Sequence, residues 1–66
     1  MISLIVNGEQ VKTSSKDLSE LVREHELNPE KIIVEYNGEI YARNTRLNTV
    51  LKQGDKVELI QFVGGG

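Results

Sequence analysis

The chain has 66 residues, of which 38% are hydrophobic and 27% charged, and it contains no cysteine. This length allows one small domain and excludes barrel and doubly wound enzyme folds, and the lack of cysteine excludes disulfides and thiolate metal sites. Ten acidic against eight basic residues give a net charge of -2, unlike the basic surface of a nucleic-acid-binding protein. The single histidine, His25, cannot form a zinc site or a catalytic dyad alone.

The N-terminal residues predict a β-hairpin. Ile2, Leu4 and Val6 alternate with their neighbours in the two-residue period of a strand. Asn7-Gly8 follows, and this dipeptide favours a type I′ turn because both of its residues accept positive φ. Residues 10–13 then alternate again and form the returning strand.

A short helix is expected after this hairpin. Residues 14–17, Ser-Ser-Lys-Asp, favour a helix start in which a serine hydroxyl accepts an amide hydrogen bond of the first turn. Asn28-Pro29 ends the helix after about ten residues, and a helix that short is stable only when it packs on the sheet. The residues that share its inner face are Leu18, Leu21, Val22 and His25.

The second half of the chain predicts three more strands. Residues 32–36 alternate, Asn37-Gly38 repeats the turn signal, and residues 40–42 begin the return. Residues 43–48 are polar and irregular, and Val50-Leu51 forms a small apolar plug. A turn at residues 53–55 precedes the last strand, residues 56–62.

The order strand-strand-helix-strand-strand-strand predicts an α+β fold of the ubiquitin-like β-grasp type. A right-handed crossover allows the first and last strands to lie side by side in parallel, in a mixed sheet of four to five strands with one main helix on one face. We expect the domain to span residues 1–63 and a glycine tail to follow at residues 64–66. The expected core is Leu4, Val6, Leu18, Leu21, Val22, Val34, Val57 and Leu59.

Two features are candidates for function. The first is the end of the chain, Phe62-Val63-Gly64-Gly65-Gly66, because a carboxylate without side chains around it can enter a narrow channel and be activated as an acyl-adenylate. The second is the sheet face opposite the helix, where alternation places Ile33, Ile60 and Phe62 as a docking patch for a partner. The plain alternatives are an inert linker for the glycines and ordinary apolar surface for the patch.

The sequence resembles the ThiS family, the sulfur carrier proteins of thiamine biosynthesis, over its whole length. The resemblance rests on five segments, namely Val6-Asn7-Gly8, residues 36–40, Arg43, Gly54-Asp55 and residues 62–66. The specific part is the glycine terminus after a compact domain. Ala42 stands where the family commonly has proline, so the loop that follows is expected to differ locally.

This resemblance implies a protein substrate and not an enzyme, with no catalytic residue and no metal site of its own. An E1-like enzyme using ATP and Mg²⁺ would adenylate the carboxylate of Gly66, and a persulfide donor would convert it to a thiocarboxylate. Gly64 and Gly65 would thread into the partner, and thiazole synthase would take the sulfur. The alternatives are a carrier for another pathway, of the molybdopterin or protein-conjugating type, and a β-grasp interaction domain that carries nothing.

No segment of the sequence indicates a membrane location. The longest apolar run, residues 4–6, is far too short to span a bilayer, and residues 1–3 lack the basic residues of a signal peptide. We therefore expect a cytoplasmic protein that acts by being bound by other proteins, and that binds neither membranes nor nucleic acids.

Overall fold

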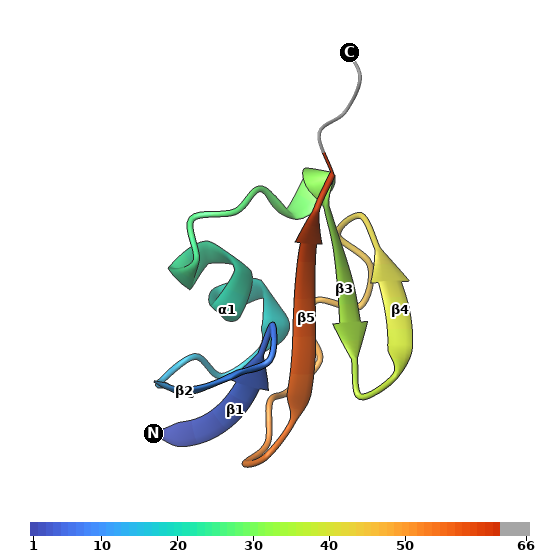
Figure 1. Ribbon diagram of the computed structural model, residues 1–66. Helices are drawn as coiled ribbons and strands as arrows, with labels where there is room; N and C mark the ends of the chain where they lie inside the picture. The colour runs from blue at the N-terminus through green and yellow to red at the C-terminus, as the bar shows by residue number, and fades with distance from the viewer. Residues whose placement is uncertain (63–66) are drawn as a thin grey trace.

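The structure is a computed structural model and describes residues 1–62. The predicted tail, Gly64 to Gly66, and the domain boundary at residue 63 lie outside the described residues and stay predictions. The described elements, in chain order, are β1 (Ile2–Val6), β2 (Glu9–Thr13), α1 (Leu18–Glu24), the 3₁₀ turn η1 (Pro29–Lys31), β3 (Ile32–Tyr36), β4 (Glu39–Ala42) and β5 (Lys56–Gln61), as Figure 1 shows.

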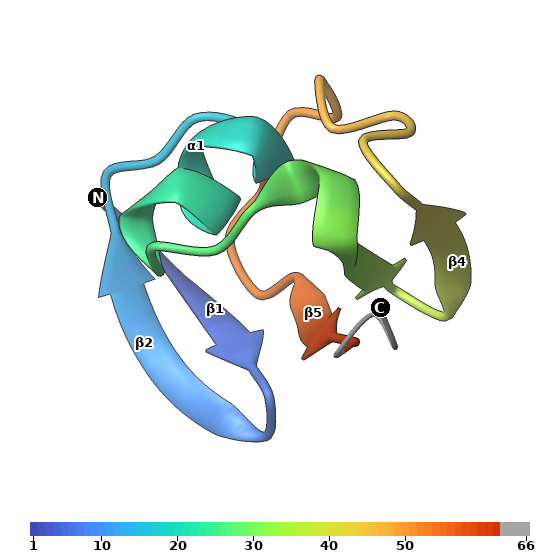
Figure 2. The same cartoon turned by 90° about the horizontal axis from the view of Figure 1, so that it is seen from above.

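The five strands form one mixed sheet in the order β2-β1-β5-β3-β4. The first and last strands pair in parallel at the centre, with Val6 opposite Val57, and the other pairs are antiparallel. Seen from above, α1 lies on one side of the curved sheet and leaves the other side open (Figure 2). The predicted β-grasp fold is confirmed, and it has one covered and one uncovered sheet face.

Both predicted hairpin turns are present. The φ angles are 52° at Asn7 and 83° at Gly8, and 49° at Asn37 and 92° at Gly38. Asparagine tolerates this left-handed region better than most residues and glycine adopts it freely, so the two dipeptides set the registers of β1 with β2 and of β3 with β4.

The helix is shorter than predicted and begins differently. Asp17, not a serine, is its N-cap and accepts a hydrogen bond from the Glu20 N–H at 2.9 Å. A carboxylate cap also suits the positive end of the helix dipole. α1 ends after seven residues, ahead of Asn28-Pro29, with exposed His25 as its C-cap. His25 therefore does not continue the buried face, which stops at Val22.

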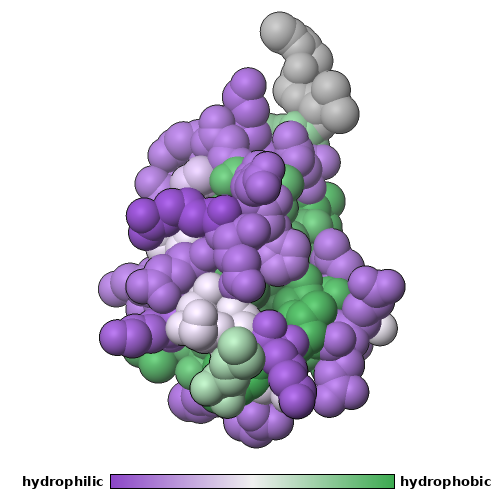
Figure 3. Space-filling model, turned by 90° about the vertical axis from the view of Figure 1, so that its left-hand side faces the viewer, coloured by the Kyte–Doolittle hydropathy of each residue, from purple (hydrophilic) through white to green (hydrophobic). Residues whose placement is uncertain are grey.

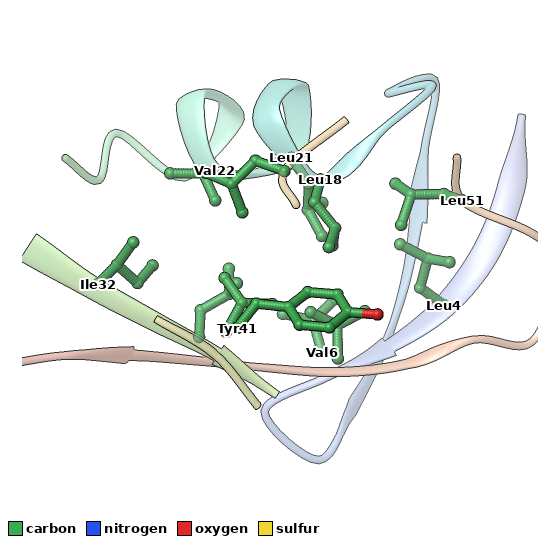
Figure 4. Packing of buried hydrophobic residues seen from close by; sticks show 12 residues of the cluster. Leu4, Val6, Leu18, Leu21, Val22, Ile32, Tyr41 and Leu51 are labelled. Atoms are coloured by element: carbon green, nitrogen blue, oxygen red, sulfur yellow. The ribbon is translucent and has the colours of Figure 1, made fainter. Parts of the chain in front are cut away.

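A single core lies between α1 and the sheet (Figure 4). All eight predicted core residues are buried, so the predicted alternation of faces is confirmed. Four further hydrophobic side chains are buried in the core beside these eight. They are Ile32, Tyr41, Leu47 and Leu51.

The loop between β4 and β5 supplies part of this core. Residues 43–48 are irregular, as predicted, but Leu47 lies inside and its carbonyl accepts a hydrogen bond from the Ser19 N–H at 2.8 Å. Of the predicted Val50-Leu51 plug, only Leu51 is buried, and Val50 is 65% exposed. The last strand ends at Gln61, one residue earlier than predicted.

Candidate functional site

The open sheet face carries a short apolar row across three strands. Ile33 of β3 is paired with Ile60 of β5 on one side and with Ala42 of β4 on the other. Ile60 is 46% exposed and Ile33 is half-buried. The structure therefore brings together two of the three predicted docking residues, and we call Ala42, Ile33 and Ile60 the apolar row.

Phe62, the third predicted docking residue, lies just beyond the end of β5. Its N–H donates to the Lys31 carbonyl at 3.3 Å, and the Arg43 guanidinium lies 5.4 Å from the centre of its ring. A guanidinium over an aromatic face is an attractive cation–π contact. Phe62 is thus held by the β4–β5 loop at the point where the sequence enters the predicted tail, and we call Phe62 with Arg43 the tail root.

A second row of the same face follows the apolar row and was not foreseen from the sequence. In it, Glu35 of β3 is paired with Glu58 of β5 and with Ile40 of β4, which is 71% exposed. Glu35 and Glu58 line a shallow hollow of about 90 Å³ together with Gly38 and Lys56.

In the space-filling view of the β1–β2 side, apolar surface lies in separate areas among hydrophilic side chains (Figure 3).

A larger hollow, of about 460 Å³, lies near the N-terminus and offers no chemistry of its own. It is lined by Met1, Ile2, residues 13–16, Val50 and Leu51, among which Lys16 is the only residue with a titratable side chain. The end of β5, which leads to the tail root, lies at the opposite end of the molecule (Figure 1). This hollow therefore has no role in the candidate site.

Asp55 is a buried carboxylate that joins the β3–β4 turn to the turn before β5. It accepts hydrogen bonds from the Tyr36 hydroxyl at 2.6 Å, the Asn37 side chain at 3.1 Å and the Lys52 N–H at 2.8 Å. Burial alone would raise the pKa of Asp55, but these hydrogen bonds outweigh it and hold the pKa below its ordinary value. The hydrogen bond from the Tyr36 hydroxyl to Asp55, together with burial, raises the pKa of Tyr36 to about 12.

The acidic side chains of α1 serve the fold. Asp17 caps the helix, and Glu20 accepts a hydrogen bond from the Lys16 N–H at 2.7 Å. Glu24 accepts hydrogen bonds from the hydroxyls of Thr13 at 2.5 Å and Ser15 at 2.8 Å. These two bonds lower the pKa of Glu24.

A metal site and a membrane-spanning helix are both absent from the described residues. Across residues 1–62 no group of three His, Cys, Asp or Glu side chains is placed to hold a metal ion. In the same part of the chain no helix is long and apolar enough to cross a membrane. The open sheet face and the tail root are the candidate features for contact with another molecule.

Comparison with known proteins agrees with this architecture. The sequence model of the ThiS family matches residues 3–66, almost the whole chain and all three terminal glycines. The chain belongs to the ThiS family. The crystal structure of the thiamine biosynthesis protein ThiS from Geobacter metallireducens has a TM-score of 0.77 and 33% sequence identity to it, and the match covers 98% of this chain and 100% of that ThiS chain. The ThiS resemblance predicted from the sequence is therefore confirmed, and with it the β-grasp fold.

Curated relatives of this ThiS-family chain include two larger proteins. The thiazole synthase of Paramagnetospirillum magneticum is 33% identical over 66 residues, which are 98% of this chain and 20% of the synthase. The thiazole synthase of Magnetococcus marinus is 42% identical over 38 residues, 58% of this chain and 12% of that synthase. The chain thus spans one fifth or less of these relatives. The uncharacterized protein ycf40 of Porphyra purpurea is 35% identical over 66 residues, 98% of this chain and 93% of its own length.

Proposed function

We propose that the protein is a sulfur carrier for the thiazole step of thiamine biosynthesis, and that it is modified at Gly66 by partner enzymes. The observation that carries the proposal is the ThiS-family match through residue 66, which includes the glycines that follow β5. The two thiazole synthases that contain a segment similar to this chain support the same pathway. As in small carrier proteins generally, the chemistry belongs to the partners.

The proposed cycle begins with activation of the Gly66 carboxylate. One carboxylate oxygen attacks the α-phosphorus of ATP in an E1-like enzyme, and pyrophosphate leaves with the Mg²⁺ of that enzyme. The terminal sulfur of a persulfide donor then attacks the carbonyl carbon, AMP leaves, and an acyl disulfide forms. A thiol reduces its sulfur–sulfur bond and releases the thiocarboxylate. Thiazole synthase then takes this sulfur, and an oxygen from its substrate or from water replaces it on the acyl carbon, which restores the Gly66 carboxylate.

Gly64 and Gly65 fit this cycle for a steric reason. Without a Cβ they give the chain its smallest cross-section, which lets the terminal carboxylate pass through a channel to the reacting atoms. Ile33, Ile60 and Phe62 hold the carrier on the partner while the tail is inserted. The apolar row contributes through desolvated area, and the tail contributes through positioning.

Intact-mass spectrometry tests the proposal directly. The purified protein is incubated with the E1-like enzyme, ATP, Mg²⁺, a persulfide donor and a thiol, and Geobacter metallireducens ThiS serves as the positive control. Replacement of one oxygen by sulfur raises the mass by about 16 Da, and addition of thiazole synthase with its substrate returns the mass to the starting value. A variant that lacks Gly66 should stay unchanged.

The alternatives give different results in the same experiment. A carrier for another pathway gains sulfur but keeps it in the presence of thiazole synthase. A β-grasp interaction domain shows no mass change while the positive control reacts. Either result refutes the thiazole-carrier proposal.

A further inference from the structure

The two hairpin turns share the sequence Asn-Gly-Glu, at residues 7–9 and 37–39. Asparagine before glycine is prone to spontaneous deamidation, because glycine has no Cβ to hinder attack of its nitrogen on the side-chain amide. The other three asparagines precede proline, which has no N–H, or threonine, which is branched at Cβ. The two turns are therefore the candidate deamidation sites of this chain, and they have the same local chemistry.

The backbone of the turns does not distinguish the two sites. The φ angles of Asn7 and Asn37 are 52° and 49°, and both side chains are exposed. Within residues 1–62 neither Gly8 nor Gly38 donates its N–H to a backbone carbonyl. The space beside both glycines is open, since a Cβ there would have no neighbour within 4 Å. Any difference in reactivity therefore comes from how each asparagine amide is held.

The side chain of Asn37 is held at both ends. Its Oδ1 accepts a hydrogen bond from the Lys56 N–H at 2.8 Å, and its Nδ2 donates to Asp55 at 3.1 Å. Attack on this amide requires it to turn away from both partners, and ammonia would have to leave from the nitrogen that the carboxylate holds. Because Asp55 is buried, water does not readily replace the donor that this carboxylate would lose.

The side chain of Asn7 is held at one end. Its Oδ1 accepts a hydrogen bond from the Leu59 N–H at 2.8 Å, whereas its Nδ2 donates to no group among residues 1–62. Turning this amide breaks one hydrogen bond between uncharged groups, which costs less than the two bonds at Asn37. The Nδ2 atom is also open to water, which supplies the proton that the nitrogen needs in order to leave.

The product of deamidation also fits better at Asn7 than at Asn37. The reaction replaces an amide nitrogen with a carboxylate oxygen. At position 7 this carboxylate still accepts the Leu59 N–H, now in a charge-assisted hydrogen bond. At position 37 it would stand where Nδ2 now lies 3.1 Å from Asp55, and two carboxylates would repel each other. The fold thus protects the asparagine whose loss it tolerates least.

We infer that Asn7 is a site of spontaneous deamidation in the folded protein and that Asn37 is protected from it by its two hydrogen bonds. A base in solution removes the proton of the Gly8 N–H, and the Gly8 nitrogen attacks the Cγ of Asn7. The bond from Cγ to Nδ2 breaks, the nitrogen takes a proton from water and leaves as ammonia, and a succinimide ring remains. Water then opens the ring at either carbonyl carbon and leaves aspartate or isoaspartate, with one added negative charge.

Peptide mapping tests the inference on the intact protein. The protein is kept folded in mildly alkaline buffer, and samples taken at intervals are digested with trypsin, with a zero-time sample to correct for reaction during digestion. Asn7 and Asn37 then lie in separate peptides, residues 1–12 and 32–43, and each deamidation adds about 1 Da. Asn7 should react about tenfold faster than Asn37, or more. In concentrated urea the two matched Asn-Gly-Glu segments should react at equal rates.

A pair of variants separates the hydrogen bond to Asp55 from general loss of stability. Asp55→Ala removes the acceptor of the Asn37 Nδ2 and should speed deamidation at Asn37. The matched control is Leu21→Ala, which destabilises the core beneath α1 and leaves the bonds of both asparagines in place. Asp55→Ala should therefore raise the rate at Asn37 more than Leu21→Ala does.

Several outcomes overturn the inference. They are equal rates at the two sites of the folded protein, a faster rate at Asn37, and no reaction of Asn7 while the unfolded chain reacts. Unequal rates in urea also overturn it, because residues outside the shared segment then decide the difference. An equal rise at Asn37 in Asp55→Ala and Leu21→Ala contradicts protection by the hydrogen bond. The carrier function is decided separately, by the mass change with ATP and a sulfur donor.

Discussion

The carboxylate of Asp55 offers the sharpest test of how the turns are held together. Replacing it with alanine removes the acceptor for the Tyr36 hydroxyl, the Asn37 amide and the Lys52 N–H. A hydrogen bond to a charged group contributes about 1.5–3 kcal/mol where it is buried. Asp55 is 8% exposed, but Asn37 is exposed and water replaces its bond. We therefore expect Asp55→Ala to lower the free energy of unfolding by about 2–4 kcal/mol.

Two measurements check this expectation. Urea denaturation followed by circular dichroism gives the free energy of unfolding, and Asp55→Asn is the matched control. Asparagine retains one acceptor oxygen for Tyr36 and Lys52 but places an amide opposite the Asn37 amide, so we expect a loss about half as large. The ultraviolet absorbance of tyrosinate, followed as the pH is raised, gives the pKa of Tyr36. Tyr36 should titrate at about 12 in the wild type and at a clearly lower pKa in Asp55→Ala, where burial alone still raises it.

The sign of the pH effect follows from the raised pKa of Tyr36. The unfolded chain loses the tyrosine proton at about pH 10, and the folded protein loses it at about 12. The stabilisation is therefore complete below the unfolded pKa and is lost as the pH rises through the folded one. An unchanged urea midpoint in Asp55→Ala, or a Tyr36 that still titrates near 12 in that variant, refutes this account of the hydrogen bonds to Asp55.

Three further predictions concern the core, the division between docking and chemistry, and acid. Leu59→Ala should lower the free energy of unfolding by about 2–5 kcal/mol because the side chain is 7% exposed, and an unchanged thermal midpoint contradicts its place in the core. Ile60→Asp should weaken the affinity for the partner while the fold stays intact. Gly65→Val should leave that affinity unchanged and lower the rate of thiocarboxylate formation by about 100-fold. The reverse pattern argues against the division of docking and chemistry between the open sheet face and the tail. The hydrogen bonds to Glu24 lower its pKa, so the stability that they add is present above the ordinary glutamate pKa. This stability is lost as the pH falls through the pKa of Glu24 in the folded protein. Glu24→Gln should therefore make the free energy of unfolding depend less on pH in acid.

The elements that local rules control were predictable from the sequence. Alternation placed Leu4 and Val6 inside, and the two Asn-Gly turns fixed both hairpins, because strand period and positive φ are properties of neighbouring residues. The parallel contact between β1 and β5 followed from the order of the elements. The same alternation correctly placed Ile33 and Ile60 together on the open face.

The parts that depend on distant contacts were not predictable. Ser14, Ser15 and Asp17 near the helix start are all good caps, and the choice of Asp17 goes with the burial of Leu18 and Leu21 against the sheet. Leu47 lies in a polar, irregular loop, so no periodicity marks it as buried. The pairing of Glu35 with Glu58 requires the register of β3 on β5, which no local pattern contains.

The central position of β5 has a consequence for how the chain folds. Ser3 and Gln53, 50 residues apart in the sequence, are hydrogen-bonded, and Asn7 accepts a bond from the Leu59 N–H across 52 residues. Closing a loop of that length costs about 3.5 kcal/mol of chain entropy beyond a constant term. The two hairpins, whose contacts are local, can therefore form early, whereas the complete sheet forms only when β5 joins them. A chain interrupted before β5 has two separate hairpins and no sheet between them. The presence of β5 thus becomes a condition for folding, and the sheet forms only when the segment that precedes the terminal glycines is in place.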